Sequence, residues 1–228
     1  MSAYKLEPGQ SLKLTQKTIL SDKVVEFEFE KPAGFLFESG QFLQFKIPTN
    51  DGSVWRSYSI ASPPSHPHLE FCIKLVDLGK ASAHFQKMIP GDSVEVRGPE
   101  GMFVCKQDTQ TKYFIATGVG LAPIMSIIRH LPSLEKINLL FGVRDETGLF
   151  WLDRLAHLQV QNPNFKLQVS LSQPSAEWNG LKGRVTEHLT IDPLGHYYIC
   201  GRVEMVKDVR RLLIDQGVNT KNIHFEIF

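Results

Sequence analysis

Residues 117–123 have the sequence Thr-Gly-Val-Gly-Leu-Ala-Pro and lie between an apolar run and a helical pattern. The apolar run at residues 113–116 predicts a strand, and residues 123–130 predict a helix that starts at a proline, which suits a first helical turn. The two glycines let backbone amides approach a pyrophosphate, and the positive end of the helix dipole favours that anion. The proline stands where the GxGxxG motif has its last glycine, so a tight turn without a ligand is an equally consistent interpretation.

The second half of the chain continues this strand-to-helix rhythm. We expect strands at residues 137–142, 166–171, 197–200 and 222–228, and helices at residues 149–158, 185–189 and 203–216. Such alternation predicts an open, doubly wound parallel α/β sheet with helices on both faces. These sheets bind ligands beyond the carboxyl ends of their strands, so the turns at Thr117, Gly142 and Cys200 are expected to share one crevice.

The first half of the chain has a different pattern, made of short β-rich runs between turn residues. The six runs lie at residues 12–20, 24–29, 42–47, 56–61, 69–75 and 93–96. They predict an antiparallel six-stranded Greek-key β-barrel. A polar stretch at residues 106–112 separates the two patterns, and it predicts two domains, residues 1–107 and 108–228.

The composition limits the classes of partner and location. The chain has 228 residues, of which 42% are hydrophobic, and this content is typical of a folded protein. Its formal charge is only +1, so it has no overall positive field that would attract nucleic acid. Its three cysteines and eight histidines show no metal-ligand spacing, so no metal site is expected. No apolar run approaches the roughly 18 residues of a membrane span, and no signal sequence is visible, which predicts a soluble cytoplasmic protein.

Residues 56–62, Arg-Ser-Tyr-Ser-Ile-Ala-Ser, place a cation, an aromatic ring and a hydroxyl on one extended segment. Strand alternation sends Arg56 and Tyr58 to one face and Ser57 and Ser59 to the other, so a ligand reaching both Tyr58 and Ser59 must lie near a strand end or bend. Arg56 suits a pyrophosphate, the Tyr58 ring suits an aromatic ligand, and the Ser59 hydroxyl suits a heteroatom, as a flavin requires. A plain edge strand is the alternative.

A second anion site is expected at residues 79–82, Gly-Lys-Ala-Ser, before a short helix predicted at residues 83–88. Its backbone amides, hydroxyl and ammonium suit a phosphate, although a simple helix cap is the alternative. Two anion sites in different domains match one flavin and one nicotinamide nucleotide, because each carries a pyrophosphate.

Two features near the end of the chain bear on the same crevice. Cys200 ends an apolar strand directly before Gly201, where a doubly wound sheet presents side chains to its ligand; a buried structural thiol is the alternative. Residues 226–228, Glu-Ile-Phe, put an aromatic ring where the last strand finishes. An ordinary core-packing strand is the alternative there.

In this order, the motifs resemble those of ferredoxin-NADP reductases and their relatives, which include cytochrome b5 reductases and reductase components of oxygenases. The likeness spans nearly the whole chain, and residues 97–103 resemble the closing turn of the barrel. The resemblance implies that FAD contacts Arg56, Ser57, Tyr58, Ser59, Ile73, Lys74, Leu75, Gly79, Lys80, Ala81 and Ser82. It implies that the nicotinamide nucleotide contacts Thr117, Gly118, Gly120, Pro123, Arg144, Ser172, Cys200, Gly201 and Met205.

The resemblance also implies a mechanism, in which hydride passes from NAD(P)H to FAD. Phe228 is expected to cover the flavin face that awaits the nicotinamide and to move aside when it arrives. Ser59, Cys200 and Glu226 are implied as catalytic residues. Ser59 would bond near the accepting nitrogen, Glu226 would fix Ser59 or relay a proton, and Cys200 would press on the nicotinamide. Electrons would then pass to a separate ferredoxin, flavodoxin or oxygenase component.

The chain also departs from the family pattern. Gln173 follows Ser172 where many NADPH-specific members have an arginine, although Arg144 and Arg184 remain available for a 2′-phosphate, so NADH and NADPH both stay open. Three scattered cysteines cannot bind a fused iron–sulfur cluster. Two other functions stay open: an NAD(P)H:flavin reductase that releases reduced flavin, which the loop at residues 79–82 argues against, and a non-catalytic electron-transfer subunit.

Overall fold

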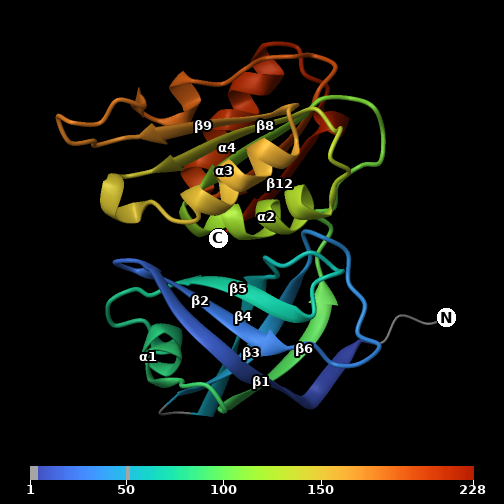
Figure 1. The fold of residues 1–228 in the computed structure, drawn as a ribbon, viewed down its shortest axis with the longest axis vertical. Coiled ribbons are helices and arrows are strands. Elements are labelled where there is room, and N and C mark those ends of the chain that lie inside the picture. The colour runs from blue at the N-terminus through green and yellow to red at the C-terminus, as the bar shows by residue number, and fades with distance from the viewer. Residues whose placement is uncertain (1–4, 50–51) are drawn as a thin grey trace. The chain divides into compact units, whose positions relative to one another are not determined.

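The computed structural model describes residues 5–49 and 52–228, which form two compact units (Figure 1). The first unit contains the chain up to Val104 together with Met125–His130. The second contains Cys105–Ile124 and Leu131–Phe228. The predicted boundary between residues 107 and 108 stays a prediction, and residues 1–4 of the predicted first domain lie outside the described residues.

The first unit is built on six antiparallel strands, as predicted. They are β1 (Leu6–Ser21), β2 (Val24–Glu30), β3 (Phe42–Thr49), β4 (Gly52–Ser59), β5 (His68–Lys74) and β6 (Ser93–Glu100). Their order is β4-β3-β6-β1-β2-β5, so β6 returns across the unit to lie between β3 and β1, as in a Greek key. The sheet curves into a half-barrel whose edge strands approach at one end, where Ile60 bridges Phe71.

Phenylalanine rings fill the core of the first unit. Phe45 packs edge to face on Phe71, Phe29 and Phe85, with ring centroids 4.9 to 5.9 Å apart, and each of these side chains is fully buried. Edge-to-face packing suits the positive ring edge and the negative ring face. Phe85 belongs to the helix α1 (Lys80–Lys87), so this ring attaches α1 to the half-barrel.

The helix α1 differs from the prediction at its start. It was expected to begin at residue 83, but it begins at Lys80, with Gly79 as its N-cap. The Ala83 amide donates to the Gly79 carbonyl at 3.0 Å and closes the first turn. The predicted anion-binding residues 80–82 are therefore the first turn of the helix itself and not a loop that precedes it.

The second unit is the predicted parallel α/β sheet. Its strands are β7 (Lys112–Thr117), β8 (Ile137–Val143), β9 (Phe165–Leu171), β10 (Leu181–Lys182), β11 (His196–Gly201) and β12 (Ile223–Ile227). Their order is β10-β9-β8-β7-β11-β12, and all neighbouring pairs are parallel. The strands β7 to β10 follow one another toward one edge of the sheet, and the chain then crosses back to place β11 on the other side of β7. The strand order therefore reverses between β7 and β11, which makes this the switch point of the sheet.

The helices α3 (Leu152–Gln161) and α4 (Val203–Asp215) pack on this sheet, and α2 (Leu121–His130) follows the turn after β7. The helix α4 buries Val206, Val209 and Leu213 in one cluster with Tyr197 and Ile199 of β11. The opposite face of the sheet includes Phe141, whose ring contacts Phe150 just before α3 at 5.5 Å between centroids. Helices on both faces agree with the prediction.

Two small elements of the second unit differ from the prediction in type, and α2 and α3 begin at Leu121 and Leu152 and not at the expected residues 123 and 149. The helix expected at residues 185–189 is a single 3-10 turn, Val185–Glu187, because its backbone bonds run from residue i+3 back to residue i, as in His188 N–H to Val185 O at 3.1 Å. The two-residue strand β10 was not predicted, since two residues are too short to show an alternating pattern.

His224 supplies a pH-dependent element in the second unit. Its ring stacks on Tyr198, with centroids 4.8 Å apart. Burial disfavours the charged imidazolium, and Lys106 and His196 repel it while Asp108 favours it, so the pKa of His224 falls from 6.5 to about 4. Below pH 6.5 the unfolded chain therefore binds more protons at this position than the folded chain does, and stability falls as the pH drops toward 4.

We therefore expect the His224→Phe variant, which keeps a ring on Tyr198 but cannot titrate, to lose less stability than the wild type between pH 7 and pH 4.5. Urea unfolding at both pH values measures this difference. His157→Phe is the matched control, because His157 is exposed on α3. An equal acid loss in the wild type and the His224→Phe variant would show that His224 does not contribute.

Candidate active site

The end of strand β4 carries the residues predicted to contact the flavin. Tyr58 lies opposite Leu43, and Arg56 lies opposite Phe45, so both point to the barrel side of β4. The Tyr58 ring packs edge to face on Phe45 at 5.4 Å and on Phe85 at 5.2 Å. Arg56 is exposed beside it. The structure thus brings Arg56 and Tyr58 together as predicted.

Ser57 lies apart from this pair. It sits opposite Gln44, alternates to the outer face of β4 and is exposed. Ser59, by contrast, is only 4% exposed. The next two residues are hydrogen-bonded to two different segments of the first unit. The Ile60 amide donates to Gln41 O at 3.0 Å, and the Ala61 amide donates to Glu70 O at 2.7 Å. These bonds hold the end of β4, and with it Ser59, in one place.

The protonation of Tyr58 follows from its surroundings. Burial raises its pKa to about 12, and the nearby Arg56 cation offsets only part of that rise. The phenol therefore stays protonated at neutral pH, and a ring so placed offers an uncharged aromatic edge or face to a ligand. Tyr58 is half-buried, with its core side already packed.

The strand β5 and its continuation carry the next predicted contacts. Ile73 is 2% exposed and belongs to the core, whereas Lys74 is exposed and Leu75 is half-buried. The Leu75 amide donates to Lys23 O at 2.7 Å, which fixes the chain as it leaves β5. Of these three side chains, Lys74 and Leu75 are therefore the ones with surface to offer a ligand.

The first turn of α1 fits a phosphate group. Gly79 has no side-chain cap and no acidic residue follows it in that turn, so the amides of Lys80 and Ala81 are not covered by a carboxylate. A Cβ atom on Gly79 would lie 2.7 Å from Val76 Cγ2 and 2.9 Å from Ser82 Oγ. The Ser82 hydroxyl accepts from the Val76 amide at 2.8 Å, which leaves its own proton to donate.

In the second unit, the turn after β7 packs against the end of β11. A Cβ atom on Gly120 would lie 2.3 Å from the Cys200 carbonyl oxygen and 2.9 Å from the Gly201 nitrogen, so only glycine allows this approach. Thr117 lies opposite Gly142 in the register, and Ala116 lies opposite Cys200. The turns at Thr117, Gly142 and Cys200 thus lie together at one edge of the sheet, as predicted.

The same turn fits a pyrophosphate. Gly118 has φ +56°, and a Cβ atom there would meet nothing within 4 Å, so open space lies beside its backbone. Within the described part of the chain, the buried Thr117 Oγ1 has no hydrogen-bond partner, and buried hydroxyls are normally satisfied. The turn leads into α2, which has Pro123 in its first turn. The open space beside the Gly118 backbone and the hydroxyl of Thr117, both at a helix N-terminus, suit a phosphate ligand.

Cys200 is fully buried on β11, opposite Glu226 of β12. Burial, and secondarily the Glu226 carboxylate, raise the pKa of the Cys200 thiol well above its usual range. The thiol is therefore neutral at physiological pH, and it acts as a packing group and not as a nucleophile. Met205 approaches the same strand end, since a Cβ atom on Gly201 would lie 2.9 Å from Met205 Cε.

The ends of three further strands carry the residues that were predicted to bear on NADH or NADPH preference. Arg144 follows β8, and its Nε donates to Gln173 Oε1 at 2.8 Å, while the Gln173 amide donates to Arg144 O at 2.7 Å. Ser172 follows β9, with its amide bonded to Val143 O at 3.2 Å, and Arg184 follows β10. The Arg144–Gln173 pair was not predicted, because the sequence does not show that these two strand ends meet.

The end of the chain is anchored to β11. The Phe228 amide donates to the Gly201 carbonyl at 3.1 Å, while the Phe228 ring is 45% exposed. The strand β12 therefore delivers an aromatic ring to the carboxyl end of the strand that carries Cys200 and Gly201.

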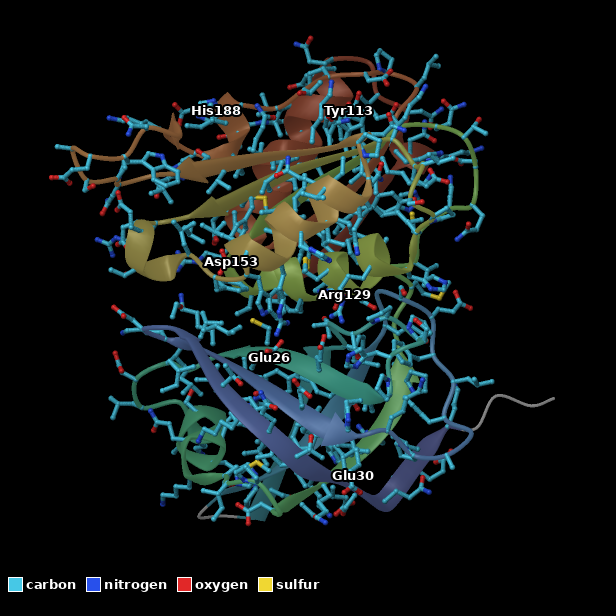
Figure 2. All side chains as sticks on the ribbon, in the orientation of Figure 1. Glu26, Glu30, Tyr113, Arg129, Asp153 and His188 are labelled. Carbon is cyan, nitrogen blue, oxygen red and sulfur yellow. The ribbon has the colours of Figure 1, made fainter. Side chains whose placement is uncertain are left out.

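A small surface hollow, with room for about one water molecule, lies elsewhere on the second unit. Tyr113, Asn138, Leu140, Gln168 and His188 contribute to its lining, and Figure 2 labels Tyr113 and His188. Tyr113 and Asn138 are near the amino ends of β7 and β8, so this hollow does not coincide with the predicted nucleotide site.

Among residues 5–49 and 52–228, no three metal-ligating side chains lie close enough together to hold a metal ion. No helix in those ranges combines the length and apolarity that crossing a bilayer demands.

Comparison with known proteins identifies the family. Residues 11–105 match the model of the oxidoreductase FAD-binding domain, and residues 114–211 match that of the oxidoreductase NAD-binding domain. The chain is 32% identical over 225 residues to ferredoxin–NADP reductase B of Sorangium cellulosum, covering 91% of this chain and 92% of that protein. The chain belongs to the ferredoxin-NADP reductase family.

Other members of the family support this assignment. The reductase is 30% identical to the 2-halobenzoate 1,2-dioxygenase electron transfer component of Burkholderia cepacia over 84% of its own length but only 59% of that protein. A crystal structure of a ferredoxin NADP+ reductase from Neisseria gonorrhoeae with bound FAD and NADP is 27% identical, with a TM-score of 0.84 over 96% of this chain and 98% of that one. The reductase is thus an FAD- and NAD(P)-binding oxidoreductase.

Proposed function

We propose that this reductase takes hydride from NAD(P)H onto FAD and passes the electrons to a separate protein, a ferredoxin, a flavodoxin or an oxygenase component. NAD(P)H supplies the hydride, and FAD accepts two electrons and releases them singly. The observation that carries the proposal is the presence, in one chain, of two helix N-termini that each suit a phosphate: the first turn of α1 and the turn from Thr117 into α2.

In the first unit, the proposed roles follow the chemistry of each group. Arg56 and the first-turn amides of α1 hold the FAD pyrophosphate through charge and aligned N–H donors. The Tyr58 ring packs against the flavin, with its phenol protonated. The Ser59 hydroxyl donates to the nitrogen that receives hydride, and its position is fixed by the bonds that follow it at Ile60 and Ala61.

In the second unit, the Thr117–Pro123 turn holds the pyrophosphate of the nicotinamide nucleotide. Cys200 orients the nicotinamide as a neutral packing group, which its raised pKa supports. Glu226 is proposed to orient Ser59 or to relay a proton, and Phe228 to cover the flavin until NAD(P)H arrives. Gly142, Arg144 and Ser172 follow the neighbouring strands and are proposed to contact the rest of the nucleotide.

The identity of the acceptor rests on the relatives. One relative is named for ferredoxin and another for electron transfer to a dioxygenase. Both names suit a one-electron protein carrier, and neither selects among the three candidates for this chain. NADH and NADPH likewise both stay open as the hydride donor, and the cytoplasmic location stays a prediction.

Purified full-length protein tests the proposal. We expect a yellow protein with tightly bound FAD that NADH or NADPH bleaches without oxygen and that reduces ferredoxin, flavodoxin or both. Titration with NADH and NADPH in turn gives the preference. A colourless protein that reduces added free flavin would instead indicate a flavin reductase. A yellow protein that scarcely oxidises NAD(P)H alone would indicate an electron-transfer subunit.

A further inference from the structure

Lys17 of strand β1 binds the carboxyl end of helix α1. Its Nζ donates to three backbone carbonyls: Phe85 O at 3.1 Å, Gln86 O at 2.7 Å and Met88 O at 3.0 Å. An ammonium group has three N–H donors, so this contact uses all of them. The partners are 68 to 71 residues away in the sequence, and the ammonium also lies 5.6 Å from the centre of the Phe27 ring.

The helix α1 needs such support because it is only eight residues long. Helices of this length are marginal in water on their own, since few backbone bonds offset the cost of nucleation. At its carboxyl end, Met88 is extended and no glycine follows to close the last turn. A cation among the last carbonyls satisfies these groups and opposes the negative end of the helix dipole.

The amino end of α1 has a hydrogen bond from the Val76 amide to the Ser82 hydroxyl but no charged or capping side chain. Gly79 makes no side-chain cap, and the first turn carries no acidic residue. A cap or a carboxylate there would stabilise the helix but would also compete with a phosphate for the first-turn amides. Lys17 and the buried Phe85 ring therefore hold the carboxyl-terminal part of α1, away from the first-turn amides that would bind the phosphate.

We propose that Lys17 is a positioning residue for FAD: by holding the carboxyl end of α1, it keeps the first turn of that helix formed and ready for the FAD pyrophosphate. This inference rests on the proposed function, in which that turn binds the pyrophosphate. The Lys17 ammonium contacts the carbonyls of Phe85, Gln86 and Met88 and the Phe27 ring, so it acts on the cofactor through the helix.

The proposal predicts a selective loss of affinity. Without the Lys17 charge, α1 spends part of its time frayed, and the apparent dissociation constant for FAD rises in inverse proportion to the fraction of protein with the first turn formed. Riboflavin has no phosphate and relies on the Tyr58 side of the site, so its affinity should hardly change. Lys17→Met keeps most of the aliphatic stem over Phe27 and removes the charge.

The experiment uses full-length protein stripped of FAD and titrated separately with FAD and riboflavin, with flavin fluorescence as the signal. For Lys17→Met we expect the dissociation constant for FAD to rise about tenfold and that for riboflavin to stay within about twofold of the wild type. Lys17→Arg keeps a cation near the carbonyls and should recover most of the FAD affinity. Lys17→Gln replaces the methionine variant if the latter does not fold.

Lys13→Met is the matched control, because Lys13 is on the same strand and pairs with Glu30 at 3.6 Å, with both side chains more than half exposed. It should leave both affinities unchanged. Equal weakening of FAD and riboflavin in Lys17→Met would mean a general loss of stability, and unchanged FAD affinity would mean that α1 does not need Lys17; either result overturns the inference. A wild-type protein that binds no FAD would instead reject the proposed function.

Discussion

The Ser59→Ala variant is expected to retain FAD and to accept hydride from NAD(P)H about 100-fold more slowly than the wild type, since loss of one positioned donor at a reacting centre typically costs that much. Ser59 suits this role because it is buried and the two residues after it are hydrogen-bonded to different segments of the first unit. A donor held in this way needs little reorganisation when the reaction occurs. FAD should stay bound, because Arg56, Tyr58 and the first turn of α1 are unchanged.

Stopped-flow measurement of flavin bleaching by excess NADH or NADPH without oxygen gives this rate directly. The FAD content of the purified variant, read from its visible spectrum, separates slow chemistry from lost cofactor. Ser53→Ala is the matched control, because Ser53 is exposed on the same strand. A Ser59→Ala variant that bleaches within about twofold of the wild-type rate would rule out a role for this hydroxyl in hydride transfer.

For the Gly120→Ala variant, we expect the dissociation constant for the nicotinamide nucleotide to rise more than tenfold, with FAD content unchanged. The added methyl group would lie 2.3 Å from the Cys200 carbonyl oxygen and 2.6 Å from its carbon, and both are backbone atoms that cannot rotate away. The turn must therefore move off the end of β11. Overpacking of this kind costs about 1–3 kcal/mol in stability, and a displaced turn no longer presents its amides to the pyrophosphate.

Titration of the oxidised protein with NAD+ and NADP+ measures this affinity without turnover, and thermal unfolding measures the cost in stability. Gly148→Ala is the control, because a Cβ atom there comes no nearer than 3.3 Å to the Val143 side chain. If Gly120→Ala binds both nucleotides as tightly as the wild type, the turn after β7 is not their pyrophosphate site.

Hydrophobic periodicity made most of the strands and helices predictable. The runs at residues 24–29 and 137–142 differ from β2 and β8 by one residue at most, because buried strands must repeat apolar side chains with a fixed period. The start of α1 was misplaced because a helix that begins at an uncapped glycine has no N-cap signal in its sequence. The strand β10 was missed because two residues carry no period.

The candidate site was predictable only as far as local motifs extend. Arg56 with Tyr58, and Gly118 with Gly120, each lie within a few residues of one another, so spacing alone suggested their chemistry. The bond from Arg144 to Gln173 joins two strand ends 29 residues apart. The state of the Cys200 thiol depends on complete burial and on a carboxylate from the neighbouring strand. No local pattern reports either of these.

The sequence by itself determined most of the strands and helices, the two turns that we propose as anion sites and the resemblance to ferredoxin-NADP reductases, because these depend on side-chain period and on residues that are neighbours in the chain. Only the tertiary structure decided that Gly120 must be glycine beside the Cys200 carbonyl and that Lys17 secures a helix about 70 residues away. These contacts arise when strand order and register bring distant backbone atoms together. Strand order is fixed by how the whole core packs and is not encoded in any short segment.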